Sequence, residues 1–278
     1  PHGVFNWTNS LVNRQEQQRG RTNRNYHNRF DRAVYENYLH ANRAVEEGVL
    51  PDRIVVLGSA RYCEEWQQTN LGIQPVPFSP SKGRGCTYKV VFMLPQWHYN
   101  ADFEATMQAL RRISDEPWLH VVMKAHTRET TTHPPYLREL AALPNAEIAG
   151  DIGSVALIQW ADAVISIGSD IALEVLRQGK VNLDPRYLHD NTTVFQEIGA
   201  QWGVHDDQEL VTALTWLSQG QQPPYGEEQI SRVMAELVSP EPTKSEVLAR
   251  HVDFIQGGWR EHPTYENQLL ADGRSIPL

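Results

Sequence analysis

The stretch VISIGSDIALEVLRQGKVNLD, from Val164 to Asp184, contains the pattern that decides the fold. An apolar run, VISI, is followed by Gly168, Ser169 and Asp170 and then by apolar positions that recur with helical spacing. The stretch ends in KVNLD, a short apolar run of the kind that forms a strand. It therefore predicts a strand, a tight turn, a helix and a second strand, which is the repeating unit of a parallel sheet.

The same alternation extends along the middle of the chain. Strands are expected at 88–95, 118–126, 146–150, 162–168 and 180–184, the last of these ending the sheet. Helices are expected between them at 101–114, 154–161 and 171–179, and after them at 208–219, 228–238 and 243–259. Strands and helices that alternate with short connections are typical of a parallel sheet covered by helices.

Three elements are expected nearer the start of the chain, a strand at 32–35, a helix at 36–47 and a strand at 53–58. The segment 71–85 is dense in proline and glycine and has no sustained period, so we expect a linker between two domains there.

The chain begins with Pro1 in the sequence PHG, which is typical of a strand end and a loop. We therefore expect that an upstream part is missing.

The bulk composition limits the possible classes of protein. With 278 residues, 40% hydrophobic and 21% charged, the sequence is that of an ordinary globular protein. The net charge of −9 argues against nucleic acid as a partner, because duplex binding needs a basic face. The apolar runs fall short of the ~20 residues that span a bilayer. Cys63 and Cys86 have no metal-ligand spacing, and their number fits a reducing cytoplasm.

Small polar residues follow the predicted strand at 162–168. Ligands of doubly wound sheets bind beyond the carboxyl ends of the strands, and the first N–H groups of a helix favour an anion such as phosphate. Gly168, Ser169 and Asp170 lie at such a point, and Glu174 follows one turn later, where it is placed to bind ribose hydroxyls. The alternative is an ordinary helix cap, for which Ser and Asp are common residues. The charge of Asp170 also opposes a phosphate.

A second loop, MKAHTRETTTHPPY at 123–136, follows another predicted strand. It contains Lys124, His126, Arg128 and His133. Cationic and imidazole donors at the carboxyl end of a strand suit a phosphate that departs with negative charge. The alternative is a solvated polar loop whose histidines only pack. The spacing of the two histidines does not indicate a metal site.

Taken together, the motifs KxHxRE, WADAVIS and GSxIALExxxxGK resemble the nucleotide-binding C-terminal domain of GT-B glycosyltransferases. The pattern is most similar to that of bacterial capsule and lipopolysaccharide polysaccharide enzymes, such as the CMP-Kdo-dependent transferases and the CDP-glycerol glycerophosphotransferases. UDP-N-acetylglucosamine 2-epimerases also have a small-residue turn followed by a ribose-binding glutamate. The resemblance implies an α/β fold of two Rossmann-like domains with parallel sheets, the N-terminal one incomplete in this chain.

The resemblance also implies roles in the loop after the second strand of the sheet. KAHTRE resembles the family's K-P-H-P-R stretch, which puts His126 on the donor phosphate as a catalytic residue. Lys124 and Arg128 are then phosphate-binding residues. Ala125 and Thr127 depart from the family pattern, in which both positions are proline.

In the turn, Gly168 and Ser169 match the family's phosphate-binding positions, and Asp170 replaces the second residue of a Ser-Ser pair. Glu174 matches the glutamate on the ribose. PHG resembles the HG loop of the family's N-terminal domain, which makes His2 a candidate base or phosphate contact. Asp31 is a weaker substitute for the family's acidic catalyst.

The resemblance divides the chain into three parts: 1–75 as the end of an acceptor-side domain, 76–250 as a nucleotide-sugar-binding Rossmann-like domain, and 251–278 as a C-terminal helix and tail. Gln96, Trp97 and His98 are expected to line the cleft. The first strand of the second domain ends just before these three residues.

The function implied is transfer of a sugar from a CMP-, CDP- or UDP-linked donor to a bacterial surface glycan, with an oligosaccharide or lipid-linked glycan as the acceptor. No metal or other cofactor is expected, because the sequence has no DxD motif. A cytoplasmic location is expected, with peripheral association at the inner face of the membrane left open. Two alternatives remain, an enzyme resembling the 2-epimerases and a non-catalytic GT-B-like binding module, which Asp170 favours.

Overall fold

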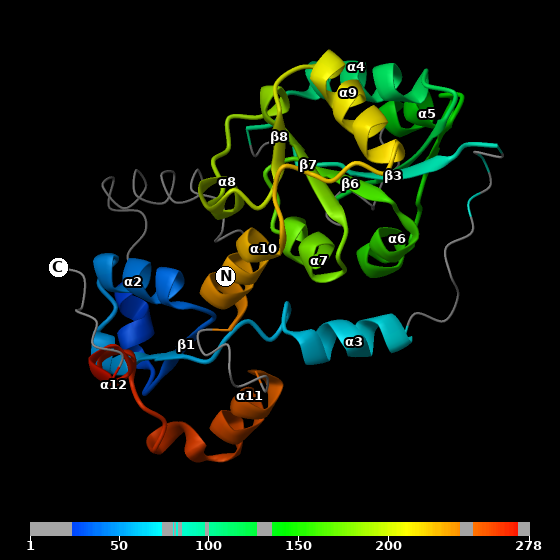
Figure 1. Ribbon diagram of the computed structural model, residues 1–278. Coiled ribbons are helices and arrows are strands. Elements are labelled where there is room, and N and C mark those ends of the chain that lie inside the picture. Colours follow the sequence, from blue (N-terminus) through cyan, green and yellow to red (C-terminus); the bar gives the residue numbers. More distant parts are fainter. Residues whose placement is uncertain are drawn as a thin grey trace. The chain divides into compact units, whose positions relative to one another are not determined.

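The computed structural model describes residues 24–73, 80, 82, 85–97, 100–126, 135–239 and 247–271. These residues form two compact units, and the chain passes between them after Thr69 and again after Gln229. The larger unit contains the described residues from 70 to 229. The smaller unit contains those from 24 to 69 and from 230 to 271. Figure 1 shows the elements of both units.

The larger unit is built on a six-stranded parallel sheet with the order β5-β4-β3-β6-β7-β8. The strands are β3 (Tyr88–Met93), β4 (Leu119–Lys124), β5 (Ala146–Ile148), β6 (Ala163–Ser166), β7 (Val181–Pro185) and β8 (Trp202–Val204). The first five confirm the predicted strands. The prediction that the sheet ends with 180–184 was wrong, because β8 adds an edge strand of only three residues beyond it.

Helices cover both faces of this sheet (Figure 1). One layer contains α4 (Phe103–Ser114), α5 (Pro135–Ala141) and α9 (Asp207–Ser218), and the other contains α6 (Ser154–Trp160) and α7 (Ile171–Arg177). Val90 and Phe92 of β3 pack in the core of the first layer, and Val91 and Met93 pack in that of the second. This is the two-residue period of a strand that is buried on both faces.

The smaller unit has a two-stranded parallel sheet of β1 (Ala33–Tyr35) and β2 (Ile54–Val56), with α2 (Tyr38–Glu46) between the strands. Its other elements are η1 (Arg24–Arg29), η2 (Pro51–Arg53), the π-helical turn η5 (Met234–Val238), α11 (Val247–Gln256), η6 (Gly258–Arg260) and α12 (Tyr265–Ala271). Tyr265 and Leu269 of α12 share a core with both strands. The protein therefore has the predicted α/β fold with parallel sheets.

The chain passes from one unit to the other within two helices, α3 (Glu64–Ile73) and α10 (Glu227–Val233).

One buried side chain, that of Asn37, connects α2 with η5, two elements of the smaller unit that are far apart in the sequence. Asn37 is fully buried and caps α2, because its Oδ1 accepts a hydrogen bond from His40 N–H at 2.9 Å. Its Nδ2 donates to the carbonyl of Leu237 in η5 at 3.0 Å. The next carbonyl, that of Val238, accepts from Ser59 N–H at 2.7 Å. Carbonyls at a helix end have no partner within the helix, so these two bonds satisfy them from residues distant in sequence.

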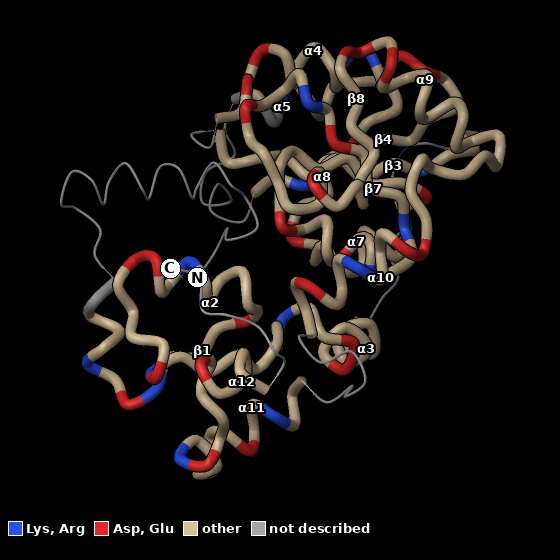
Figure 2. Tube along the Cα trace, turned by 60° about the vertical axis from the view of Figure 1, so that its left-hand side comes forward, with Lys and Arg blue, Asp and Glu red and all other residues tan. Residues whose placement is uncertain are grey.

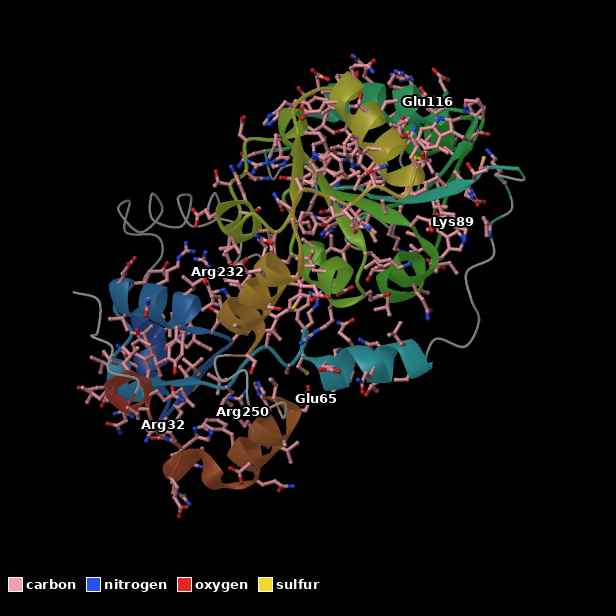
Figure 3. All side chains as sticks on the ribbon, in the orientation of Figure 1. Arg32, Glu65, Lys89, Glu116, Arg232 and Arg250 are labelled. Atoms are coloured by element: carbon pink, nitrogen blue, oxygen red, sulfur yellow. The ribbon has the colours of Figure 1, made fainter. Side chains whose placement is uncertain are left out.

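A buried histidine and a partly buried carboxylate form a pair near the amino ends of β4 and β5. His120 Nε2 lies 3.1 Å from Glu147 Oε1, and the ring of Trp160 meets His120 edge-on. Lys89, which is labelled in Figure 3, has its Nζ over the Trp160 ring, 5.9 Å from the ring centroid. Burial lowers the pKa of His120, and Glu147 acts in the opposite direction.

The lowered pKa of His120 predicts a pH-dependent stability. The unfolded histidine, with a pKa of about 6.5, binds a proton more readily than the folded one, so stability is fully present above that pH and falls as the pH drops below it. We expect His120→Gln to flatten the fall in unfolding free energy between pH 6.5 and 5 by up to about 1.4 kcal/mol per pH unit. Urea titrations across this range measure it. The same change at the exposed His205 is the control, and equal slopes for all three proteins contradict the prediction.

Candidate functional site at the carboxyl edge of the sheet

The carboxyl ends of the strands share one edge of the larger unit, and the direction of the chain across the sheet reverses at β3. β4 and β5 follow on one side of β3, and β6 then begins the other side. The register places Lys124, Met93 and Ser166 side by side at the ends of β4, β3 and β6. Such a reversal leaves a crevice in which ligands of open α/β sheets bind. Because neighbouring strands lie ~4.8 Å apart, the loops after β4 and β6 begin roughly 10 Å apart.

The loop after β4 supplies the first pair of predicted site residues. Lys124 Nζ donates a hydrogen bond to the carbonyl of Gly150 at 2.8 Å, in the loop after β5. Burial lowers the pKa of Lys124, and the nearby Asp151 opposes this shift. His126 lies two residues beyond the strand and is half-buried. An ammonium group has three N–H donors, so the bond to Gly150 leaves Lys124 with capacity for an anion.

The turn after β6 supplies the second group. Gly168 has a φ of +48°, and its N–H donates to Asp184 Oδ1 at 3.2 Å. Ser169 Oγ accepts from Ile171 N–H at 3.4 Å, which is the capping contact that the alternative reading of the turn expects. Asp170 makes no capping bond with its side chain. The backbone N–H of Gly168 is therefore bound to a carboxylate. The backbone N–H groups at the start of α7 come after it in the chain.

Glu174 lies on α7 and is 4% exposed. Its Oε2 accepts a hydrogen bond from Ser154 Oγ at 3.0 Å, at the start of the neighbouring α6. The sequence pattern placed Glu174 one turn into this helix, and the structure agrees. Ser154 was not singled out by the sequence analysis, because a serine at the start of a helix is normally a cap.

A group of polar residues in and after β7, most of them buried, was also missed. Its centre is Asp184, which is 1% exposed. We call this group the Asp184 cluster; it consists of Asp184, Arg186, His189, Asn191 and Gln201. The only signal in the sequence was the acidic residue that ends KVNLD, and a polar residue at a strand end is too common to indicate a cluster.

Other predicted residues contribute less to this edge. His2 and Arg128 lie outside the described residues, as do His98 and His133. Trp97 follows β3 and packs edge-on against Phe103 and Tyr136, with ring centroids 4.9 and 5.7 Å away. Asp31 belongs to the smaller unit, where it lies 3.9 Å from Arg53.

The described residues also show how charge is distributed. Acidic and basic positions are interspersed along the chain in both units (Figure 2). Within the described ranges, no three His, Cys, Asp or Glu side chains gather as they would around a metal ion. The expectation that the protein acts without a metal or other cofactor stays a prediction. None of the described helices combines the length and apolar character needed to cross a membrane.

The sequence matches no family model and no curated protein, but the structure resembles solved ones. A structure of S. aureus MnaA with UDP has 17% identity over 84% of this chain and 62% of its own, with a TM-score of 0.52. UDP-GlcNAc 2-epimerase from Neisseria meningitidis bound to UDP-GlcNAc has 15% identity over 81% and 61%, with a TM-score of 0.52. The glycotransferase of kitacinnamycin has 16% identity over 81% and 55%, with a TM-score of 0.50.

The chain thus spans less than two thirds of the length of these proteins, 55% to 62%. At such identities the likeness concerns the fold and not the activity. The parallel sheets and the likeness to these structures together show that the chain has an α/β fold of the GT-B type.

Proposed function

We propose that the protein is a glycosyltransferase that moves a sugar from a CMP-, CDP- or UDP-linked donor to a bacterial surface glycan. The observation that carries the proposal is the reversal of the sheet at β3, where the His126 loop and the Gly168 turn lie on either side of one strand. This is the position at which open α/β sheets bind nucleotides. The likeness to structures with bound UDP and UDP-GlcNAc supports the class of donor.

In the proposed reaction the bond between the anomeric carbon and the donor phosphate breaks, and an acceptor hydroxyl oxygen bonds to that carbon. The hydroxyl proton passes to a base, for which His2 is the candidate. Negative charge develops on the phosphate as it departs. Hydrogen-bond donors that bind the phosphate more tightly in the transition state than in the bound substrate lower the barrier. His126, Lys124 and Arg128 are proposed as these donors. The acceptor is proposed to be an oligosaccharide or lipid-linked glycan, reached from the cytoplasm or the inner face of the membrane.

In the same proposal the turn and α7 hold the rest of the nucleotide. Ser169 and Asp170 are proposed to offer backbone N–H groups to the phosphate. Glu174 is proposed to accept hydrogen bonds from the ribose hydroxyls. The Asp170 carboxylate must then point away from the phosphate, because two like charges at contact distance repel.

A 2-epimerase is the second candidate, because the structural neighbour from Neisseria meningitidis with bound UDP-GlcNAc is a UDP-GlcNAc 2-epimerase. The two candidates differ in what happens without an acceptor. An epimerase converts UDP-GlcNAc alone into its manno epimer, whereas a transferase releases the nucleotide only when a glycan is added. Product analysis after incubation with UDP-GlcNAc alone therefore separates them.

Nucleotide binding provides the direct test. We expect CMP, CDP or UDP to raise the melting temperature, since a ligand that binds only the native state stabilises it by about 2.7 kcal/mol at a concentration of 100 Kd. We expect Glu174→Gln to weaken the binding of that nucleotide roughly tenfold, as loss of a hydrogen bond to a charged group does. Calorimetric titration measures this.

Glu104→Gln is the matched control, because it makes the same change of charge on the exposed face of α4. It should leave nucleotide affinity as it is. The proposal fails if none of the three nucleotides binds. Binding without turnover of any donor would indicate a non-catalytic module instead.

A further inference from the structure

The carboxylate of Asp184 has three hydrogen-bond partners and forms an ion pair with Arg186. Its Oδ1 accepts from Gly168 N–H at 3.2 Å and lies 2.9 Å from His189 Nε2. Its Oδ2 accepts from Gln201 Nε2 at 2.6 Å and lies 2.9 Å from Arg186 Nε. The side chain of Asp184 is 2% exposed and that of Arg186 is 20% exposed, so the carboxylate is largely shielded from water. Both oxygens are therefore needed as acceptors.

His189 joins this carboxylate to the next segment of the chain. Asn191 N–H donates to His189 Nδ1 at 3.0 Å. A backbone N–H can only donate, so Nδ1 is the acceptor and Nε2 carries the proton that is directed at Asp184. The imidazole is completely buried, which fixes its orientation.

The cluster also contacts the turn through packing. A Cβ atom placed on Gly168 would lie 2.9 Å from Asn191 Cβ and 3.3 Å from His189 Cε1. The backbone of Gly168 therefore lies directly against the cluster. The hydrogen bond to Asp184 and the close packing against Asn191 and His189 together determine where the turn after β6 lies.

We propose that Asp184 is a positioning residue for the nucleotide site. It binds the Gly168 N–H on the inner side of the turn and so sets the direction in which Ser169 and α7 leave the sheet edge. Glu174 lies on that helix, so its position depends on the same bond. This inference rests on the proposed function, and it adds the residue that holds the phosphate and ribose contacts in place without touching the ligand.

The substitution Asp184→Asn tests the inference with almost no change in volume. Asparagine has one acceptor oxygen where aspartate has two, so its amide group must face one of the two pairs of donors. The remaining oxygen should stay on the side of Arg186, because the cation attracts the amide oxygen and repels the amide N–H groups, and because Gln201 can still donate to that oxygen. The amide then faces Gly168 and His189, and the turn loses its anchor.

Removing the competitor should restore the turn. In the double variant Asp184→Asn/Arg186→Met, the oxygen is free to accept from Gly168 and His189. The amide can then donate to Gln201, whose own amide needs only to rotate by half a turn. A role limited to general stability does not predict recovery on a second substitution.

The experiment measures nucleotide affinity by calorimetry and exchange of the Gly168 amide hydrogen by NMR. For Asp184→Asn we expect roughly tenfold weaker binding of whichever of CMP, CDP and UDP binds the native protein, together with faster exchange at Gly168. The double variant should recover most of both losses. Glu147→Gln, in the pair with the buried His120 at the other edge of the sheet, is the control and should change neither.

The outcomes separate this inference from the proposed function. If no nucleotide binds the native protein but Gly168 exchange follows the expected order, the proposed function fails and the anchoring of the turn by Asp184 stands. If nucleotide binds the native protein and Asp184→Asn equally well, or if the double variant is weaker than the single one, the inference is overturned.

Discussion

Replacing Gly168 by alanine should lower the free energy of unfolding of the larger unit by about 2 to 5 kcal/mol. Gly168 has a φ of +48°, a left-handed conformation that costs an L-residue with a Cβ about 1 to 2 kcal/mol. The new methyl group would also lie 2.9 Å from Asn191 Cβ, so the segment after β7 must move. Overpacking of this kind costs about 1 to 3 kcal/mol more. Denaturant titration of both proteins measures the difference.

Gly179, at the other end of α7, provides the control for this prediction. It also has a positive φ, of +67°, but a Cβ there would have no atom within 4 Å. Gly179→Ala should therefore show only the cost of the backbone conformation, about 1 to 2 kcal/mol. Equal losses of stability for the two variants would show that the contact between Gly168 and Asn191 does not matter.

Replacing Asn37 by alanine should destabilise the smaller unit by about 2 to 4 kcal/mol. Loss of the cap on α2 accounts for about 1 kcal/mol. The rest arises because the buried Leu237 carbonyl loses its donor, and an unsatisfied buried group costs about 1 to 3 kcal/mol. Hydrogen exchange of the α2 amides, residues 38–46, measures the loss locally, so the larger unit does not have to unfold in the same transition.

Asn37→Ser separates the two contributions. Serine can cap α2 as well as asparagine does, but its shorter side chain has no amide to reach Leu237. The difference between the serine and alanine variants reports the cap, and the difference between native protein and serine variant reports the bond to Leu237. If the serine variant is as stable as the native protein, that bond contributes nothing.

The sequence predicted the sheet well where burial leaves a clear pattern. Strands such as β3, β4 and β6 are continuous apolar runs because helices cover both of their faces. β8 was missed because an edge strand of the sequence WGV has neither the length nor the apolar run of a buried strand. α3 was missed entirely, and its last residues, 71–73, lie in the segment 71–85 that was predicted as a linker because of its prolines and glycines.

The sequence predicted the candidate site at its strand ends and in the first turn of α7. Lys124, His126 and the Gly168 turn follow apolar runs, and parallel strands bring their carboxyl ends to one edge. The contacts of Asp184 and Ser154 were not predictable, because they join residues whose positions are set by packing between elements. The pairing of Asp184 with Gln201 depends on the loop that ends in β8, and no periodic pattern marks that loop.

The place of β3 in the sheet has a consequence for synthesis on the ribosome. Among the described strands of the larger unit, β3 is the first to emerge, yet it lies at the centre. Its second neighbour, β6, begins at Ala163, more than 70 residues after Tyr88. A nascent chain that has reached only β5 therefore carries the apolar β3 with one side of its backbone unpaired. Such an edge can bind other chains, so the growing protein depends on the late arrival of β6 to avoid association with its neighbours.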